Sequence, residues 1–285
     1  MTLRLLHGLS EVAPSYDALY CDAWGVIHDG TALYDGVAEA LTRFRAERGP
    51  VVVLTNAPRL SDVIPGQLRR LGLPDDAYDT VVTSGDATRA EVERREDVAF
   101  YRLGPAKDDG LFGAIKAAFV PLERADAILC TGLLDDLHET PEDYREMLEG
   151  AARRGLPMIC ANPDKVVRYG DRIMYCAGAL ADLYETFGGE VIMAGKPHAP
   201  IYRLAREAAV RAGAPEDHRA LVIGDSVRTD ITGANAQGLD ALFVAQGVNL
   251  TEARGDDGAV SAERIEALLA EGGAHASFAA DGLRW

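Results

Sequence analysis

Short apolar runs alternate with amphipathic segments along almost the whole of this 285-residue chain. The runs are rich in aliphatic side chains, which is typical of strands buried on both faces of a parallel sheet; they are Ala18–Cys21, Val51–Leu54, Ala127–Cys130, Pro157–Cys160, Val191–Ala194, Ala220–Ile223 and Ala241–Val244. Helical periodicity predicts helices at Gly36–Arg48, Leu60–Leu71, Ala87–Glu96, Pro141–Arg154, Ala199–Ala212 and Ser261–Ala270. Because β and α segments alternate, we predict an α/β fold with helices on both faces of a parallel sheet.

The composition is that of a globular chain with a strong acidic excess. Hydrophobic residues make up 48% and charged residues 26%, and the formal net charge is −16. This charge repels nucleic-acid phosphates and anionic lipid, so we expect neither nucleic acid nor a membrane as a partner. No apolar run approaches the ~18 residues of a membrane helix and no signal-peptide pattern is present, so cytoplasmic residence is expected. The four isolated cysteines are predicted to be buried, reduced thiols.

Polar side chains follow several of the predicted strands directly. They are Asp22 after the first run, Thr55 and Asn56 after the second, Lys196 after Val191–Ala194, and Asp225 and Asp230 after Ala220–Ile223. Ligands bind at the carboxyl ends of strands in open α/β sheets, so we expect these groups to project over one sheet edge. Each has a plain structural alternative, such as a helix N-cap for Asp22 or a turn residue for Thr55.

Taken together, these residue types suit phosphoryl transfer. A carboxylate can attack phosphorus and form an aspartyl-phosphate, and a second carboxylate can hold Mg²⁺, which prefers oxygen ligands. The metal offsets the repulsion between an anionic nucleophile and an anionic phosphate. A lysine and a hydroxyl can bind the remaining phosphate oxygens.

Four segments of the chain, in order, resemble the motifs of the haloacid dehalogenase (HAD) superfamily. They are Tyr20–Ile27, Leu54–Asn56, Gly195–Pro197, and Gly224–Asp230 with its G-D-S-x-x-T-D pattern. The forms G-K-P-H-A-P-I-Y and G-D-S-V-R-T-D-I are similar to the class IIA branch. That branch includes bacterial nucleotide and sugar phosphatases and pyridoxal phosphate phosphatases. The resemblance spans about residues 15 to 250.

This resemblance implies a Rossmann-like core with an inserted α/β cap of the C2 type. The 140 residues between Thr55 and Lys196 are too many for a simple crossover. We predict a core at residues 1–82 and 189–285 and a cap at 83–188. Asn162-Pro163-Asp164 resembles the N-P-D segment that faces the active site in such enzymes, although an Asx-Pro turn explains it equally well. Tyr175–Ala179 lacks the Pro and first Gly of the branch's P-G-A-G, which suggests a different substrate.

The resemblance also implies roles for individual residues. Asp22 would be the nucleophile and a Mg²⁺ ligand, together with the backbone carbonyl of Trp24 and the carboxylates of Asp225 and Asp230. Thr55 and Lys196 would hold the phosphate, and Asn56, Asn162 and Asp164 would contact the substrate. The implied reaction is Mg²⁺-dependent hydrolysis of a small phosphorylated metabolite, a phosphate monoester, through an aspartyl-phosphate. The sequence leaves homo-oligomerisation open.

Position 24 departs from the pattern. Ordinary members have D-x-D, and the second Asp protonates the leaving alcohol and then activates water, which is worth about 10²–10⁴-fold. This chain has Asp22-Ala23-Trp24, and an indole N–H can do neither job at neutral pH.

Three interpretations of Trp24 stay open. Another group, such as His28, supplies the proton, although a histidine in a surface loop is the structural alternative. In the second interpretation, the protein acts on substrates with good leaving groups or transfers the phosphoryl group to an acceptor other than water. In the third, it binds metal and phospho-ligand without turnover. Carbon–halogen hydrolysis ranks below these, because it needs no metal and leaves Asp225 and Asp230 without a purpose.

Overall fold

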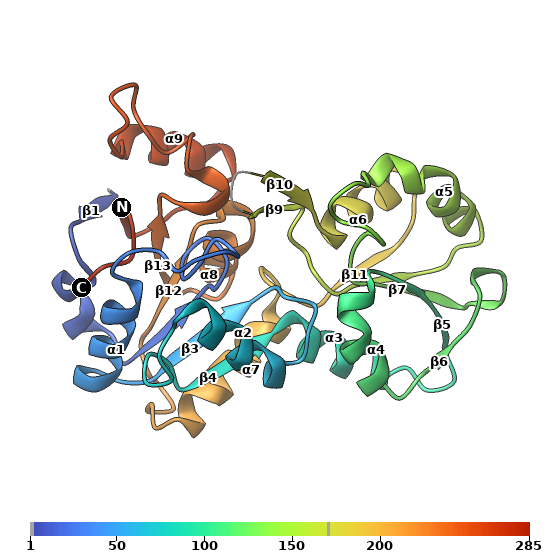
Figure 1. Ribbon diagram of the computed structural model, residues 1–285, viewed down its shortest axis with the longest axis horizontal. Helices are drawn as coiled ribbons and strands as arrows, with labels where there is room; N and C mark the ends of the chain where they lie inside the picture. The colour runs from blue at the N-terminus through green and yellow to red at the C-terminus, as the bar shows by residue number, and fades with distance from the viewer. Residues whose placement is uncertain (1–2, 170–171) are drawn as a thin grey trace.

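The computed structural model describes residues 3–169 and 172–285, so Met1, Thr2 and residues 170–171 of the predicted ranges lie outside it. Within the described chain, seven strands form a parallel sheet in the order β1-β14-β13-β12-β2-β3-β4 (Figure 1). They are β1 (Arg4–Leu6), β2 (Ala18–Cys21), β3 (Val51–Thr55), β4 (Thr80–Thr83), β12 (Ala220–Gly224), β13 (Asp240–Val244) and β14 (Phe278–Ala280). Both ends of the chain therefore contribute to this sheet.

Alternate side chains of the central strands feed two separate cores. Leu19 and Cys21 of β2 pack into a cluster with α1 (Val37–Glu47) and α2 (Ile64–Leu71). Their neighbours Ala18 and Tyr20 point the other way, into a cluster with α7 (Ala199–Arg211), α8 (Thr232–Ala236) and α9 (Ala262–Glu271). Helices thus cover both faces of the sheet, as the near-continuous apolar strands predict.

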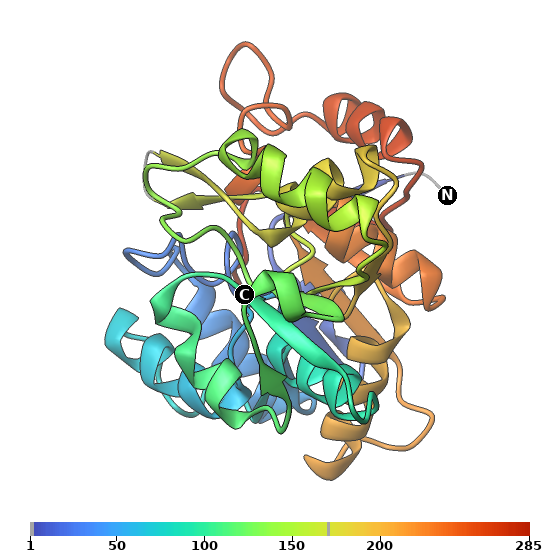
Figure 2. The same ribbon diagram turned by 90° about the vertical axis from the view of Figure 1, so that its right-hand side faces the viewer.

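A second, smaller parallel sheet is built from the middle of the chain, in the order β11-β8-β7-β5-β6. Its strands are β5 (Ala99–Leu103), β6 (Ala118–Phe119), β7 (Ala127–Cys130), β8 (Met158–Cys160) and β11 (Val191–Met193). One face packs on α3 (Ser84–Glu93) and α4 (Asp109–Ala114), and the other on α5 (Arg145–Arg153) and α6 (Ala177–Thr186). In Figure 2 these green and yellow elements face the viewer, in front of the first sheet.

An antiparallel hairpin lies between the two sheets (Figure 1). It consists of β9 (Val166–Tyr169) and β10 (Arg172–Tyr175), which pair with each other alone among the described strands. β9 contacts the short turn η8 (Gly247–Asn249) that follows β13 in the first sheet. The hairpin therefore connects the second unit to the carboxyl edge of the first sheet.

The α/β fold class is confirmed, with one correction to the expected strands. The run Val191–Ala194 was expected to lead Lys196 to the edge of the main sheet, but β11 pairs with β8 in the second sheet. The domain boundaries at residues 83 and 188 stay a prediction. β11 comes after residue 188, within the predicted core, yet it pairs with a strand of the second sheet. The four cysteines are buried and free. Among the described residues, no helix combines the length and apolarity that crossing a membrane requires.

Candidate active site

Two carboxylates meet because their strands are neighbours. β12 pairs with β2 in register, with Ile223 opposite Cys21, so Asp225 and Asp22 emerge side by side at the carboxyl ends. The backbone N–H of Asp22 donates to the carbonyl of Ile223 at 2.8 Å, which continues the pairing to that residue. Both side chains are buried, with 8% of Asp22 and 3% of Asp225 exposed.

Asp230 returns to the same place through a tight turn. After β12 the chain makes one turn of π-helix, η7 (Val227–Ile231). The N–H of Ser226 donates to Asp230 Oδ2 at 3.1 Å, which fixes the carboxylate. A Cβ at Gly224 would lie 2.1 Å from the Asp230 Cβ, so only glycine fits where the strand ends. Asp22, Asp225 and Asp230 each offer an oxygen within 4.8 Å of the others.

Lys196 lies among these carboxylates with 2% of the residue exposed. Its Nζ is 2.6 Å from Asp22 Oδ1 and 2.7 Å from Asp230 Oδ1. It arrives between β11 of the second sheet and α7 of the first, and Asn56 holds its backbone there. The Asn56 Oδ1 accepts from the Lys196 N–H at 2.7 Å, and the Asn56 Nδ2 donates to the Lys196 carbonyl at 3.2 Å. Asn56 therefore positions Lys196, whereas substrate contact by Asn56 stays a prediction.

The electrostatics of this cluster favour a bound cation. Burial raises the pKa of Asp22, Lys196 opposes that rise and Asp230 adds to it, for a net pKa of about 8. Burial, followed by the charges of Asp22 and Asp230, raises the pKa of Asp225 well above its usual range. Burial alone would lower the pKa of Lys196, but the surrounding carboxylates raise it. When all three carboxylates are ionised, one ammonium leaves an excess of negative charge, which is why the pKa values of Asp22 and Asp225 are raised, and their oxygens suit a divalent ion.

The second unit brings Asn162 and Asp164 to this edge. Asn162 Oδ1 accepts from the Asp164 N–H at 3.1 Å, as an Asx turn requires. Asp164 Oδ1 also accepts from Asn56 Nδ2 at 3.1 Å, so the same segment contacts the core motif. Asn162, Asp164 and Thr55 all line one pocket with Asp22. Their contact with a substrate stays a prediction.

His28 is not the surface histidine that its loop position suggests. Only 2% of it is exposed, and its Nδ1 accepts from the Gly30 N–H at 3.0 Å. Burial lowers the pKa of His28 to about 4. The ring is therefore neutral at pH 7 with its proton on Nε2, and a neutral imidazole is a poor proton donor. The structure disfavours His28 as a replacement general acid.

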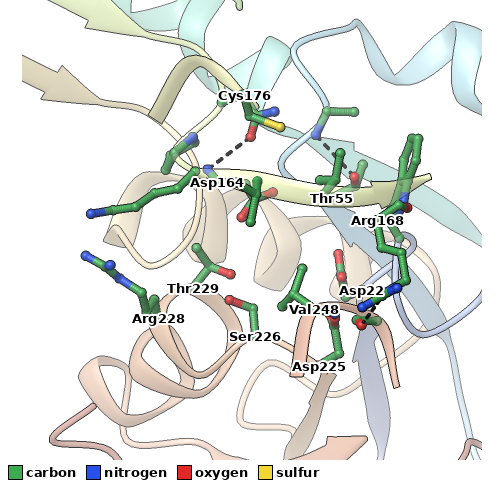
Figure 3. Close-up of a pocket in the computed structure, with 18 of the residues that line it drawn as sticks. Asp22, Thr55, Asp164, Arg168, Cys176, Asp225, Ser226, Arg228, Thr229 and Val248 are labelled. Atoms are coloured by element: carbon green, nitrogen blue, oxygen red, sulfur yellow. Dashed lines mark hydrogen bonds between the residues drawn. The ribbon is translucent and has the colours of Figure 1, made fainter. Parts of the chain in front are cut away.

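The pocket above Asp22 has a volume of about 1020 Å³ and is lined from both sheets and the hairpin. Figure 3 shows Arg168 of β9 and Arg228 of η7 on opposite sides, with Thr55, Asp22 and Asp225 nearer the middle. Neither arginine was predicted from the sequence to line the site. Arg228 lies inside the recognised fourth motif, which could have drawn attention to it, but nothing in the sequence signals that Arg168 docks here.

Removing the buried lysine should destabilise the metal-free protein. We expect Lys196→Met to lower the free energy of unfolding by about 3–5 kcal/mol, because it leaves buried carboxylates without their partner. Urea denaturation in the presence of EDTA measures this. Lys107→Met is the matched control, since Lys107 is half exposed in its pair with Asp136 and should cost less than about 1 kcal/mol. Equal effects for the two variants would contradict this account of the cluster.

Comparison with known proteins agrees with this geometry. Residues 19–111 match the family model of haloacid dehalogenase-like hydrolases, and residues 193–268 match a second, HAD-hydrolase-like model. A solved haloacid dehalogenase-like hydrolase from Brucella suis 1330 is 37% identical, with a TM-score of 0.86 over 98% of this chain and 100% of the other.

Two curated relatives are more distant. The D-glycerol 3-phosphate phosphatase of Mycobacterium tuberculosis is 28% identical over 85% of this chain and 66% of its own length. The ribonucleotide monophosphatase NagD of Escherichia coli K12 is 29% identical over 80% of this chain and 87% of its own. The first matched segment contains Asp22 and the second contains Asp225 and Asp230, and the Brucella protein matches over its entire length. This chain therefore belongs to the family of haloacid dehalogenase-like hydrolases.

Proposed function

We propose that this protein is a Mg²⁺-dependent phosphatase that hydrolyses small phosphate monoesters through an aspartyl-phosphate on Asp22. The observation that carries the proposal is the buried cluster of three carboxylates with Lys196, of which Asp22 and Asp225 line a large pocket. The curated relatives support it, since they are phosphatases of glycerol phosphate, nucleotides and sugars. The Mycobacterium glycerol phosphate phosphatase, 28% identical, has been solved with magnesium and with calcium.

In this proposal an Asp22 oxygen attacks phosphorus, and the bond from phosphorus to the ester oxygen breaks, so that the alcohol leaves as its oxyanion and takes a proton from water. Water then attacks the phosphorus of the aspartyl-phosphate, which releases inorganic phosphate and restores the carboxylate. Lys196 balances charge at the nucleophile, and Thr55 offers its hydroxyl to a phosphate oxygen. Asp22, Asp225, Asp230 and the Trp24 carbonyl would hold Mg²⁺, which supplies charge neutralisation for the incoming phosphate.

We also infer that the segment around the second sheet acts as the cap over this pocket. It supplies Asn162 and Asp164 to the lining, and the hairpin supplies Arg168. A substrate bound at Asp22 would therefore touch both units, so its selection depends on the inserted segment as well as the core. The natural substrate in this proposal is a small phosphorylated metabolite.

The test is release of p-nitrophenol from p-nitrophenyl phosphate by the purified protein, with Mg²⁺ and with EDTA. Turnover that requires Mg²⁺ supports the phosphatase. Trp24, in place of the usual acid, favours a second candidate, a protein that binds metal and phospho-ligand without hydrolysis or that transfers the phosphoryl group to another acceptor. A folded protein with no turnover of any phosphate ester would favour that candidate.

Metal binding can be measured without any substrate. At a Mg²⁺ concentration about 100-fold above the dissociation constant, we expect the free energy of unfolding to rise by about 2.7 kcal/mol. Thermal or urea unfolding with MgCl₂, against NaCl of equal ionic strength, measures the rise. Asp225→Asn is the control and should lose most of it, because a carboxylate of the cluster becomes a neutral amide. A rise of the same size in this variant would place the ion elsewhere.

A further inference from the structure

Trp24 makes a specific contact with the hairpin from the other unit. Its indole N–H donates to the backbone carbonyl of Arg168 in β9, 144 residues further along the chain. The donor of an indole is single and fixed in direction, so this bond commits the side chain to the hairpin. Trp24 stands where the family's general acid stands, and its polar atom points to the hairpin backbone.

Ring packing reinforces this hydrogen bond. The Trp24 ring lies 6.1 Å from the Tyr169 ring of β9 and 5.4 Å from the His28 ring, measured between centroids. Gly30, with a φ of +91°, lets the rings sit against its backbone. A Cβ there would come within 2.6 Å of the Trp24 ring and 2.9 Å of Tyr169. The loop from Asp22 to Gly30 is thus shaped to hold Trp24 between His28 and the hairpin.

Through Arg168, strand β9 also contacts the turn that holds Asp225, a candidate metal ligand. Arg168 Nε donates to the carbonyl of Gly247 at 3.2 Å, in the turn that follows β13. The next residue, Val248, donates its N–H to Asp225 Oδ2 at 2.8 Å, and Asn249 Nδ2 donates to the Asp225 carbonyl at 2.7 Å. Figure 3 shows Arg168 directed toward the loop that carries Val248, above Asp225. The position of the hairpin is therefore coupled to the loop that orients Asp225.

We infer that Trp24 is a positioning residue that latches the β9–β10 hairpin over the pocket and, through Arg168 and the 247–249 turn, helps to orient Asp225. The latch joins three segments that are far apart in sequence: the loop after β2, the hairpin, and the turn after β13. It gives the aromatic residue at position 24 a role other than proton transfer, and it goes beyond the proposed phosphatase reaction. Its direct consequences are conformational, so they can be measured whether or not the protein hydrolyses phosphate esters.

Amide hydrogen exchange of the full chain tests the latch. Trp24→Phe keeps an aromatic ring but removes the N–H donor. We expect exchange in Val166–Tyr169 and Arg172–Tyr175 to become roughly 3- to 10-fold faster, as expected for loss of one hydrogen bond that restrains a local opening. The chain has only two tryptophans, so Trp285→Phe is the matched control. Trp285 packs on Arg43 in the core unit, and its loss should leave the hairpin unchanged.

A second variant keeps the inference testable if Trp24→Phe does not fold. In the Trp285→Phe background, Trp24 is the only tryptophan and its fluorescence reports the latch. Tyr169→Leu, made from the hairpin side, should then shift the Trp24 emission to longer wavelength and increase its quenching by acrylamide. The inference is overturned if hairpin exchange in Trp24→Phe matches the control. It is overturned equally if Tyr169→Leu leaves the Trp24 emission and quenching unchanged.

Discussion

Asp22→Asn is expected to reduce Mg²⁺-dependent release of p-nitrophenol by about a thousandfold or more, because an amide oxygen is too weak a nucleophile to form the phosphoryl intermediate. In the native protein, Lys196 Nζ lies 2.6 Å from Asp22 Oδ1. Asn keeps the shape of the side chain and an oxygen that can accept this hydrogen bond. The variant should therefore fold while losing the chemical step. Steady-state kinetics at saturating substrate, with circular dichroism to verify folding, measures the effect.

The control for this experiment is a carboxylate of the same type at a distance from the pocket. Asp75 is 63% exposed in a surface pair with Arg69, so Asp75→Asn should retain turnover within about twofold. If Asp22→Asn kept a tenth of the native rate, Asp22 would not be the nucleophile and the proposed mechanism would fail. If the native protein itself showed no turnover, the proposed function would fail instead, so the two failures are distinguishable.

The fold was largely predictable because most of its strands are apolar on both faces. Every apolar run that was expected to form a strand does so, including Val51–Leu54 and Ala220–Ile223. Some short strands were missed: the edge strand β1 has two exposed residues of three, and β14, which pairs with both β1 and β13, lies in a closing segment with no regular pattern. Edge strands are paired along only one side, so the sequence bears a weaker apolar signature there. The assignment of β11 to the second sheet depends on pairing with β8, a partner that periodicity does not specify.

The site was predictable for those residues whose place in the fold follows from their position directly after a strand. Asp22 and Asp225 come together because each directly follows one of two neighbouring strands, and strand ends can be recognised in the sequence. Lys196 was correctly predicted to lie near these carboxylates, but it was expected to follow a strand of the main sheet, whereas β11 belongs to the second sheet. The roles of Asn56 and Arg168 could not be foreseen, because both depend on the docking of segments far apart in the sequence, 140 residues for Asn56 and Lys196 and 79 for Arg168 and Gly247. Likewise, the burial of His28 follows from packing around a loop, which no pattern near His28 reports.

The identity of the leaving group should matter unusually to this enzyme. The indole of Trp24 has no proton to give to a departing alkoxide, and its N–H already donates to Arg168. An aryl oxyanion leaves without help, whereas an alkoxide does not. We therefore compare the ratio of kcat/KM for p-nitrophenyl phosphate to kcat/KM for ethyl phosphate. We expect this ratio to be about 10²–10⁴-fold larger than in a relative that keeps the second Asp. Parallel kinetics with the two esters measure this ratio.

Trp24→Asp tests the cause of that preference. A carboxyl at position 24 should raise turnover of ethyl phosphate relative to p-nitrophenyl phosphate, because it restores a group able to protonate the alkoxide. The same substitution removes the ring that packs against Tyr169 and His28, so both absolute rates can fall, and the ratio is the informative quantity. Trp24→Phe is the control, since it disturbs the same contacts without adding an acid and should leave the ratio near the native value. If both variants changed the ratio equally, the preference would come from the shape of the pocket beneath the hairpin, and the missing acid would not explain it.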